Sequence, residues 1–221
     1  MVYTFSLPSG WSCPGAKDCH SKAVEKDGKM SIKDGAHTLF RCFSATQEVV
    51  YRGVREQRQH NFGLIKAALK RDGTHAASLI YASLPKNATV VRIHVGGDFF
   101  SKEYMKAWVQ VAKQCPDVTF YAYTKSVHFW VELLKEIPTN LKLNASKGGK
   151  HDDLIAKHNL KYAEVVYSEQ EAIDKDLEID HDDSHAFLQD KPFALLIHGV
   201  QPAGSRAAEA LKIIKNQSKT V

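Results

Sequence analysis

The sequence contains no long hydrophobic run and none of the features of an exported protein. No stretch approaches the roughly 20 consecutive apolar residues that cross a bilayer as a helix, so no membrane-spanning helix is expected. Residues 1–6 have neither a basic start nor a long apolar run and do not resemble a signal peptide. We therefore expect a cytoplasmic protein whose cysteines are reduced.

The chain also lacks a strong charge bias, internal repeats and low-complexity linkers. Its formal net charge of +5 permits an anionic partner without requiring one. A length of 221 residues is enough to bury one sizeable core. We expect a single domain, 1–221, in which a cysteine-bearing strand and loop (1–45) precede a series of βα units (46–221).

Cysteine is scarce, yet three of the four cysteines fall in the first fifth of the chain: Cys13, Cys19 and Cys42. Three thiolates suit a [4Fe–4S] cluster, which then keeps one iron for a small molecule or a fourth protein ligand. Zinc is the alternative, because His20 would complete a set of three cysteines and one histidine. Cys115 lies far away in the sequence, and we interpret it as a packed thiol.

Short β-branched and aromatic runs alternate with helical patterns along the rest of the chain. The expected strands are residues 3–7, 89–95, 118–124, 140–145, 163–168 and 193–199. Several are apolar almost throughout, which is typical of parallel strands covered on both faces. The expected helices are about 46–71, two capped by Ser101 and Ser126, one opened by Asp152 and Leu154, and 169–174 and 203–216. The alternation predicts an α/β fold with a parallel sheet.

Glycine and small polar residues follow nearly every expected strand. Gly96-Gly97-Asp98 follows the second strand, and Lys125 follows the third. Because the carboxyl ends of parallel strands form the functional edge of such folds, these residues would face the cysteines at one mouth. Structural roles are equally open, since Gly-Gly can serve a tight turn and Asp98 can cap the next helix. Lys125 can bind an anionic group, donate a proton or form a salt bridge with Asp98.

Two further groups of residues have a functional and a structural interpretation. Arg52 and Arg55, or Arg55 and Arg58, lie one turn apart on an expected helix and can clamp a carboxylate or phosphate. A solvated basic face or a nucleic-acid surface would look similar. His181, Asp182 and His185 can supply two histidines and a carboxylate to a metal. The alternative for this second group is a polar helix cap facing the cluster mouth.

The order of these features resembles a compact radical S-adenosylmethionine barrel. The resemblance rests on a cysteine loop after the first strand, Gly-Gly-acid after the second, and six apparent βα units. It implies a partial (β/α)6 barrel with parallel strands, in which Cys13, Cys19 and Cys42 hold the cluster. The usual loop of that superfamily has three and then two residues between its cysteines, whereas five and twenty-two separate them here.

The same resemblance implies a ligand on the open iron. In that superfamily the free iron is chelated by the amino and carboxylate groups of S-adenosylmethionine. Gly96, Gly97 and Asp98 occupy the place of the element that contacts the amino group. We expect Arg55 to bind the carboxylate and Lys125 to lie beside the ligand, which makes S-adenosylmethionine or another small amino-carboxylate the expected partner.

Longer phrases resemble a phage and bacterial family, the "gene product eighty-eight"-like proteins. The phrases are LPSGWSCPGA (7–16), RCFSA (41–45), VRIHVGGDFFS (91–101), FYAYTKS (120–126) and HDDSH (181–185). The resemblance implies a virus-related protein of the host cytoplasm and supplies no reaction. Two functions stay open: a radical-S-adenosylmethionine-like enzyme, or a non-catalytic iron–sulfur or zinc protein with a redox, regulatory, nucleic-acid-binding or partner-binding role.

Overall fold

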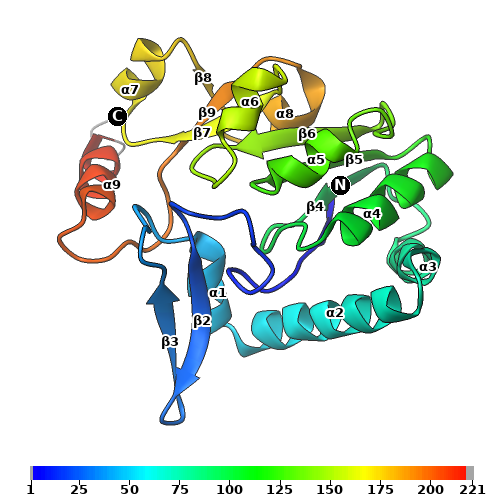
Figure 1. The fold of residues 1–221 in the computed structure, drawn as a ribbon. Helices are drawn as coiled ribbons and strands as arrows, with labels where there is room; N and C mark the ends of the chain where they lie inside the picture. Colours follow the sequence, from blue (N-terminus) through cyan, green and yellow to red (C-terminus); the bar gives the residue numbers. More distant parts are fainter. Residues whose placement is uncertain (1, 218–221) are drawn as a thin grey trace.

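Seven parallel strands form the main sheet of the computed structural model, which describes residues 2–217. In spatial order they are β1 (Val2–Phe5), β4 (Val90–Ile93), β5 (Thr119–Thr124), β6 (Leu141–Ser146), β7 (Tyr162–Val166), β9 (Phe193–Leu196) and β8 (Glu178–Ile179). The first six are the six expected strands in chain order. The α/β class and the parallel sheet are therefore confirmed. Within the described residues the sheet is open, with β1 and β8 at its edges (Figure 1).

From residue 43 on, one or more helices separate consecutive strands along the chain. They are α1 (Phe43–Val50), α2 (Arg52–Arg71), α3 (Gly73–Ser83), α4 (Lys102–Gln114), α5 (Val127–Glu132), α6 (Asp153–Lys157), α7 (Glu169–Asp174), α8 (Ser184–Leu188) and α9 (Arg206–Gln217). Among the described helices, none combines the length and apolarity needed to cross a membrane.

A side-chain cap marks the start of some helices and is missing at others. Ser101 caps α4 as predicted, because its Oγ accepts a bond from the Tyr104 amide at 3.2 Å. Ser126 does not cap α5, since its Oγ donates to the Phe99 carbonyl at 2.7 Å. The single helix predicted at about 46–71 is interrupted by extended backbone at Tyr51, and a further helix, α3, begins after Asp72.

The two faces of the sheet are covered by different kinds of side chain. Val91, Ile93 and Phe120 point toward the helices and pack in the main core with residues such as Trp108 of α4. Because strand residues alternate between faces, Arg92 and the tyrosines of β5 point to the other side. The opposite face therefore carries polar groups, whereas the sequence predicted strands that are apolar on both faces.

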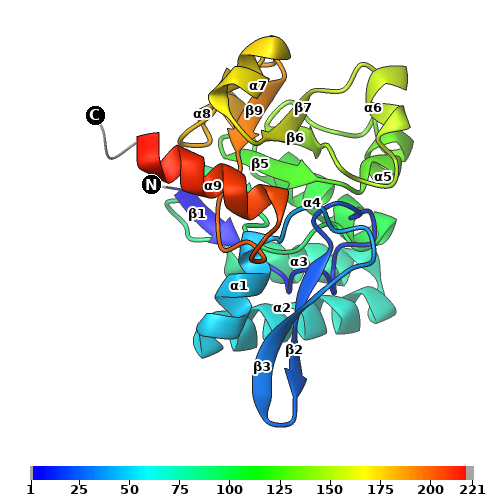
Figure 2. The same ribbon diagram turned by 90° about the vertical axis from the view of Figure 1, so that its left-hand side faces the viewer.

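A two-stranded antiparallel hairpin, which the sequence analysis did not predict, lies between the second and third cysteines. Its strands are β2 (Ser21–Lys26) and β3 (Lys29–Asp34). Asp27 and Gly28 form the turn with φ of 51° and 72°, and Asp-Gly is a favoured pair for such a two-residue turn. The hairpin projects from the rest of the molecule beside α1 (Figures 1 and 2).

Candidate functional site: a thiol-lined cavity at the strand ends

Cys13, Cys19 and Cys42 line one cavity of about 630 Å³. Residues at the carboxyl ends of β4, β5 and β6 line it too: Gly96, Gly97, Asp98, Lys125 and Ser146. The cavity continues over the polar face of the sheet, where its lining includes Arg92, Tyr123, Val165, Leu195 and His198. A volume of this size falls within the roughly 300–1,000 Å³ typical of small-molecule sites. The arrangement brings together the residues that were expected at one mouth.

The first cysteine loop is fixed by close backbone contacts. The Gly10 amide points to the Cys13 sulfur at 3.3 Å. Gly15 admits no side chain, because a Cβ there would lie 2.1 Å from the Lys125 carbonyl oxygen. The Lys150 amide donates to the Gly15 carbonyl at 2.9 Å. These contacts hold the loop against the carboxyl ends of β5 and β6.

Cys42 is positioned by parts of the chain far from it in sequence. It occupies the N-cap position of α1. The adjacent Arg41 backbone makes two hydrogen bonds with the Gln201 side chain, at 2.6 and 3.0 Å, and the Arg41 guanidinium binds both oxygens of Asp34. The hairpin and the loop before α9 therefore place Cys42 beside Cys19, although twenty-two residues separate these two cysteines in the sequence.

Burial and mutual proximity disfavour the thiolate forms of these cysteines. Burial raises the pKa of Cys42 to about 12, with a further contribution from the charge of Cys19. Burial also raises the pKa of Cys13 well above its usual value, and the charges of Asp98 and Cys42 add to the effect. The pKa of Cys19 is raised by burial, while the Lys125 ammonium opposes the shift. Three neighbouring thiolates at this position need a cationic centre between them.

Asp98 joins the ends of β4 and β5. Its carboxylate accepts bonds from the Thr124 hydroxyl at 2.6 Å, the Phe99 amide at 2.7 Å and the Lys125 amide at 2.8 Å. Burial nevertheless raises the pKa of Asp98 to about 6, because it outweighs these bonds. Asp98 does not cap α4, and its two oxygens already have protein donors.

Lys125 and the glycine pair also have structural partners. The Lys125 ammonium donates to the carbonyl and hydroxyl oxygens of Ser146, at 2.9 and 3.0 Å, and to the Lys147 carbonyl. It therefore binds the end of β6 instead of forming a salt bridge with Asp98. Gly97 has φ of 88°, and a Cβ there would lie 2.5 Å from the Ser12 hydroxyl. The turn at Gly97 lets the first cysteine loop pack against the end of β4.

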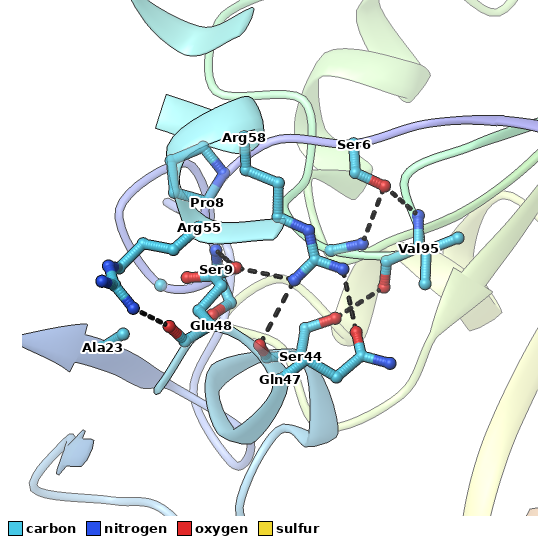
Figure 3. A network of polar contacts seen from close by, with 12 residues as sticks. Ser6, Pro8, Ser9, Ala23, Ser44, Gln47, Glu48, Arg55, Arg58 and Val95 are labelled. Atoms are coloured by element: carbon cyan, nitrogen blue, oxygen red, sulfur yellow. Dashed lines mark hydrogen bonds and ion pairs between the residues drawn. The ribbon is translucent and has the colours of Figure 1, made fainter. Parts of the chain in front are cut away.

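Arg55 is not among the described residues that line the cavity. Its guanidinium donates to the Glu48 carbonyl at 2.7 Å, because the break at Tyr51 turns the carboxyl end of α1 toward it. Arg58, one turn further along α2, is buried and forms an ion pair with the Glu48 carboxylate at 2.9 Å (Figure 3). The Glu48 carboxylate also accepts a bond from the Ser9 amide, which ties this pair to the cysteine loop. This placement leaves Arg55 outside the lining of the cavity.

A polar cluster occupies the part of the cavity that lies over the polar face of the sheet, away from the cysteines. The Asp183 carboxylate binds the Arg92 guanidinium at 2.5 Å and accepts bonds from the hydroxyls of Tyr121 and Tyr123 at 3.0 and 2.9 Å. Asp183 reaches these partners from a left-handed backbone conformation, with φ of 66°. The sequence analysis did not select Arg92 or Asp183. The sequence signal that could have identified Arg92 was its charge within the otherwise apolar run of β4.

The residues considered for zinc have other surroundings. His20 Nε2 lies 3.2 Å from the Gly10 carbonyl oxygen. His185 contacts Asp180 and Glu178 at 3.3 and 3.2 Å, whereas His181 and Asp182 line the cavity. Within residues 2–217, no three histidine, cysteine or acidic side chains are gathered in a way that would hold one metal ion.

Replacing Asp183 with Ala is expected to destabilise the fold by about 2 kcal/mol, since it removes a charged acceptor from buried Tyr121 and from half-buried Arg92 and Tyr123. Urea unfolding followed by circular dichroism measures the effect. Asp182→Ala is the matched control, because the neighbouring carboxylate is exposed and binds only backbone and side-chain groups of its own turn. Equal effects of the two substitutions would contradict the role given to Asp183.

The geometry can be compared with known proteins. A protein-family model described as "Gene product 88" matches residues 1–216. The "Gene 88 protein" of Mycobacterium phage D29 and that of Mycobacterium phage L5 are each 28% identical to the chain over 186 residues, which cover 78% of this chain and 70% of the relative. No solved structure matches. The predicted resemblance to phage proteins is thereby confirmed.

Proposed function

The chain belongs to the gene product 88 family, and we propose that it is an iron–sulfur protein that holds one [4Fe–4S] cluster through Cys13, Cys19 and Cys42. The observation that carries the proposal is the convergence of these three thiols, from the loop between β1 and β2 and the segment before α1, on one cavity at the strand ends. All three are free cysteines. We place the protein in the host cytoplasm, where a reducing environment would keep the thiols available.

The chemistry of the donor set fits such a cluster. Burial raises the pKa of each thiol, and the charges of neighbouring cysteines add to the shift at Cys13 and Cys42. Iron bound to the sulfurs would supply the positive charge that their thiolate forms lack. Each thiolate of a cluster binds a different iron, so the three sulfurs need not meet at the position of one ion. A bound cluster would supply one-electron transfer. Zinc is the less favoured alternative, because His20 bonds to Gly10.

We further propose that the sheet is a divergent radical-S-adenosylmethionine-like partial (β/α)6 barrel with an open iron position. Support comes from six parallel strands in chain order, cysteines after the first and Gly96-Gly97-Asp98 after the second. The cavity extends beyond the thiols, which leaves room for an amino-carboxylate ligand. Two arginines line it, Arg41 and Arg92, and Arg55 does not. The second candidate function is a non-catalytic iron–sulfur protein with a protein group on the fourth iron.

Anaerobic purification followed by iron and sulfide analysis tests the cluster. We expect about four irons and about four sulfides for each chain, the content of one [4Fe–4S] cluster. Stoichiometric zinc without sulfide in the native protein would contradict the proposal.

Paramagnetic resonance of the reduced protein, with and without S-adenosylmethionine, tests the open iron. A changed spectrum, together with binding measured by calorimetry, is expected for an exchangeable iron position. An unchanged spectrum without binding would favour the non-catalytic function. Asp98→Asn is a poor test here, because it would place an amide among the three donors that Asp98 now binds.

A further inference from the structure

The hairpin of β2 and β3 carries four lysines on one face, outside the cavity. Lys22 lies directly opposite Lys33, and Lys26 lies opposite Lys29. Because alternate residues of a strand share a face, all four point to the same side. Ala23 is buried on the other face, where both strands contact α1. The four residues are named the lysine face below.

The exposed lysines of the lysine face have no ion-pair partner within the described chain, although Glu25 and Asp27 lie on the same hairpin. Lys26, Lys29 and Lys33 are exposed, and none of them forms an ion pair in residues 2–217. Like charges directly opposite each other destabilise an antiparallel pair, and two such pairs occur in this short hairpin. Lys22 lies over the ring of Trp11, with 4.4 Å from its Nζ to the ring centre. A phosphate-bearing partner would relieve the repulsion between the two lysine pairs.

We propose that the lysine face binds the phosphate backbone of duplex DNA. A two-stranded ribbon is one of the shapes that the major groove admits. The two lysine pairs are four residues apart along the strands, or roughly 13 Å at about 3.3 Å per residue, and the groove is about 12 Å wide. The pairs can therefore reach phosphates on both sides of the groove, and the hairpin that carries them projects from the rest of the molecule (Figure 2).

This binding goes beyond the proposed cluster function and does not depend on it. Fluorescence anisotropy with a labelled duplex of two helical turns, about 21 base pairs, tests it over a series of salt concentrations. The variant neutralises Lys26, Lys29 and Lys33 together by substitution with Gln and leaves the Lys22–Trp11 contact in place. The control neutralises three exposed lysines of the outer helices and loops with the same change in net charge: Lys113, Lys135 and Lys157, each substituted with Gln.

We expect the hairpin variant to bind the duplex at least about tenfold more weakly than the wild type at low salt. The slope of log affinity against log salt should become shallower by about 3, because each of the three lost phosphate contacts contributes about 0.9 to it. The control should bind like the wild type. Equal weakening in both variants would reduce the effect to net charge and overturn the proposal. An absence of DNA binding by the wild type would also overturn the proposal and would point to an acidic protein partner. Tighter binding of the wild type to the corresponding single strand than to the duplex would overturn it as well. Circular dichroism and iron content of each preparation report folding and the cluster separately.

Discussion

Replacing Cys13, Cys19 or Cys42 with Ser is expected to abolish the brown colour of the anaerobic protein, together with most of its iron and sulfide. A serine hydroxyl is a much poorer ligand for iron in a cluster than a thiolate is, and two remaining thiolates hold a cluster weakly. The three sulfurs line the same cavity, so each single substitution should have a similar effect. Iron and sulfide counts for each substituted protein measure the loss.

Cys115→Ser is the matched control for these substitutions. Cys115 lies at the C-cap of α4, packs against the main core and does not line the cavity. Its substitution should leave colour and iron content unchanged. Full iron content in any of the three cavity variants, or its loss in Cys115→Ser, would contradict the ligand assignment. Circular dichroism of the four proteins separates loss of the cluster from loss of the fold.

Removing the buried arginine Arg58 of α2 is expected to cause a large loss of stability. The side chains of Arg58 and Glu48 are only 6% and 1% exposed, and burial already raises the pKa of Glu48. Arg58→Ala leaves that carboxylate buried without its partner, which typically costs about 3–5 kcal/mol. Urea unfolding of the wild type and the variant measures the difference.

The exposed pair formed by Arg52 and Glu56 provides the control on the same helix. Its side chains are 81% and 58% exposed, and 2.6 Å separates Arg52 Nε from Glu56 Oε1. Solvent screens such a pair, so Arg52→Ala should change stability little. If Arg58→Ala lowers the free energy of unfolding no more than Arg52→Ala does, the buried pair contributes no more to stability than the exposed pair. Apolar replacement of both Glu48 and Arg58 should recover much of the stability, because no unpaired charge then stays buried.

The sequence by itself determined the class of the fold and the neighbourhood of the candidate site. Apolar runs of strand length separated by helical patterns predicted six strands, and all six occur in the sheet in chain order. Capping residues such as Ser101 marked helix starts, because their bonds are local. The rule that parallel strands gather their carboxyl ends predicted that the Gly-Gly-Asp turn, Lys125 and the cysteines would meet, and these residues line one cavity.

Only the tertiary structure decided which partner each polar side chain takes. Arg55 and Arg58 are indistinguishable in the sequence pattern, yet the turn between α1 and α2 gives one a backbone carbonyl and the other a buried carboxylate. Lys125 donates to Ser146, and Asp183 reaches Arg92 across the sheet. Periodicity specifies which residues share a face of an element, because it depends on backbone geometry alone. Partner choice depends on how distant elements pack, and that information is not local.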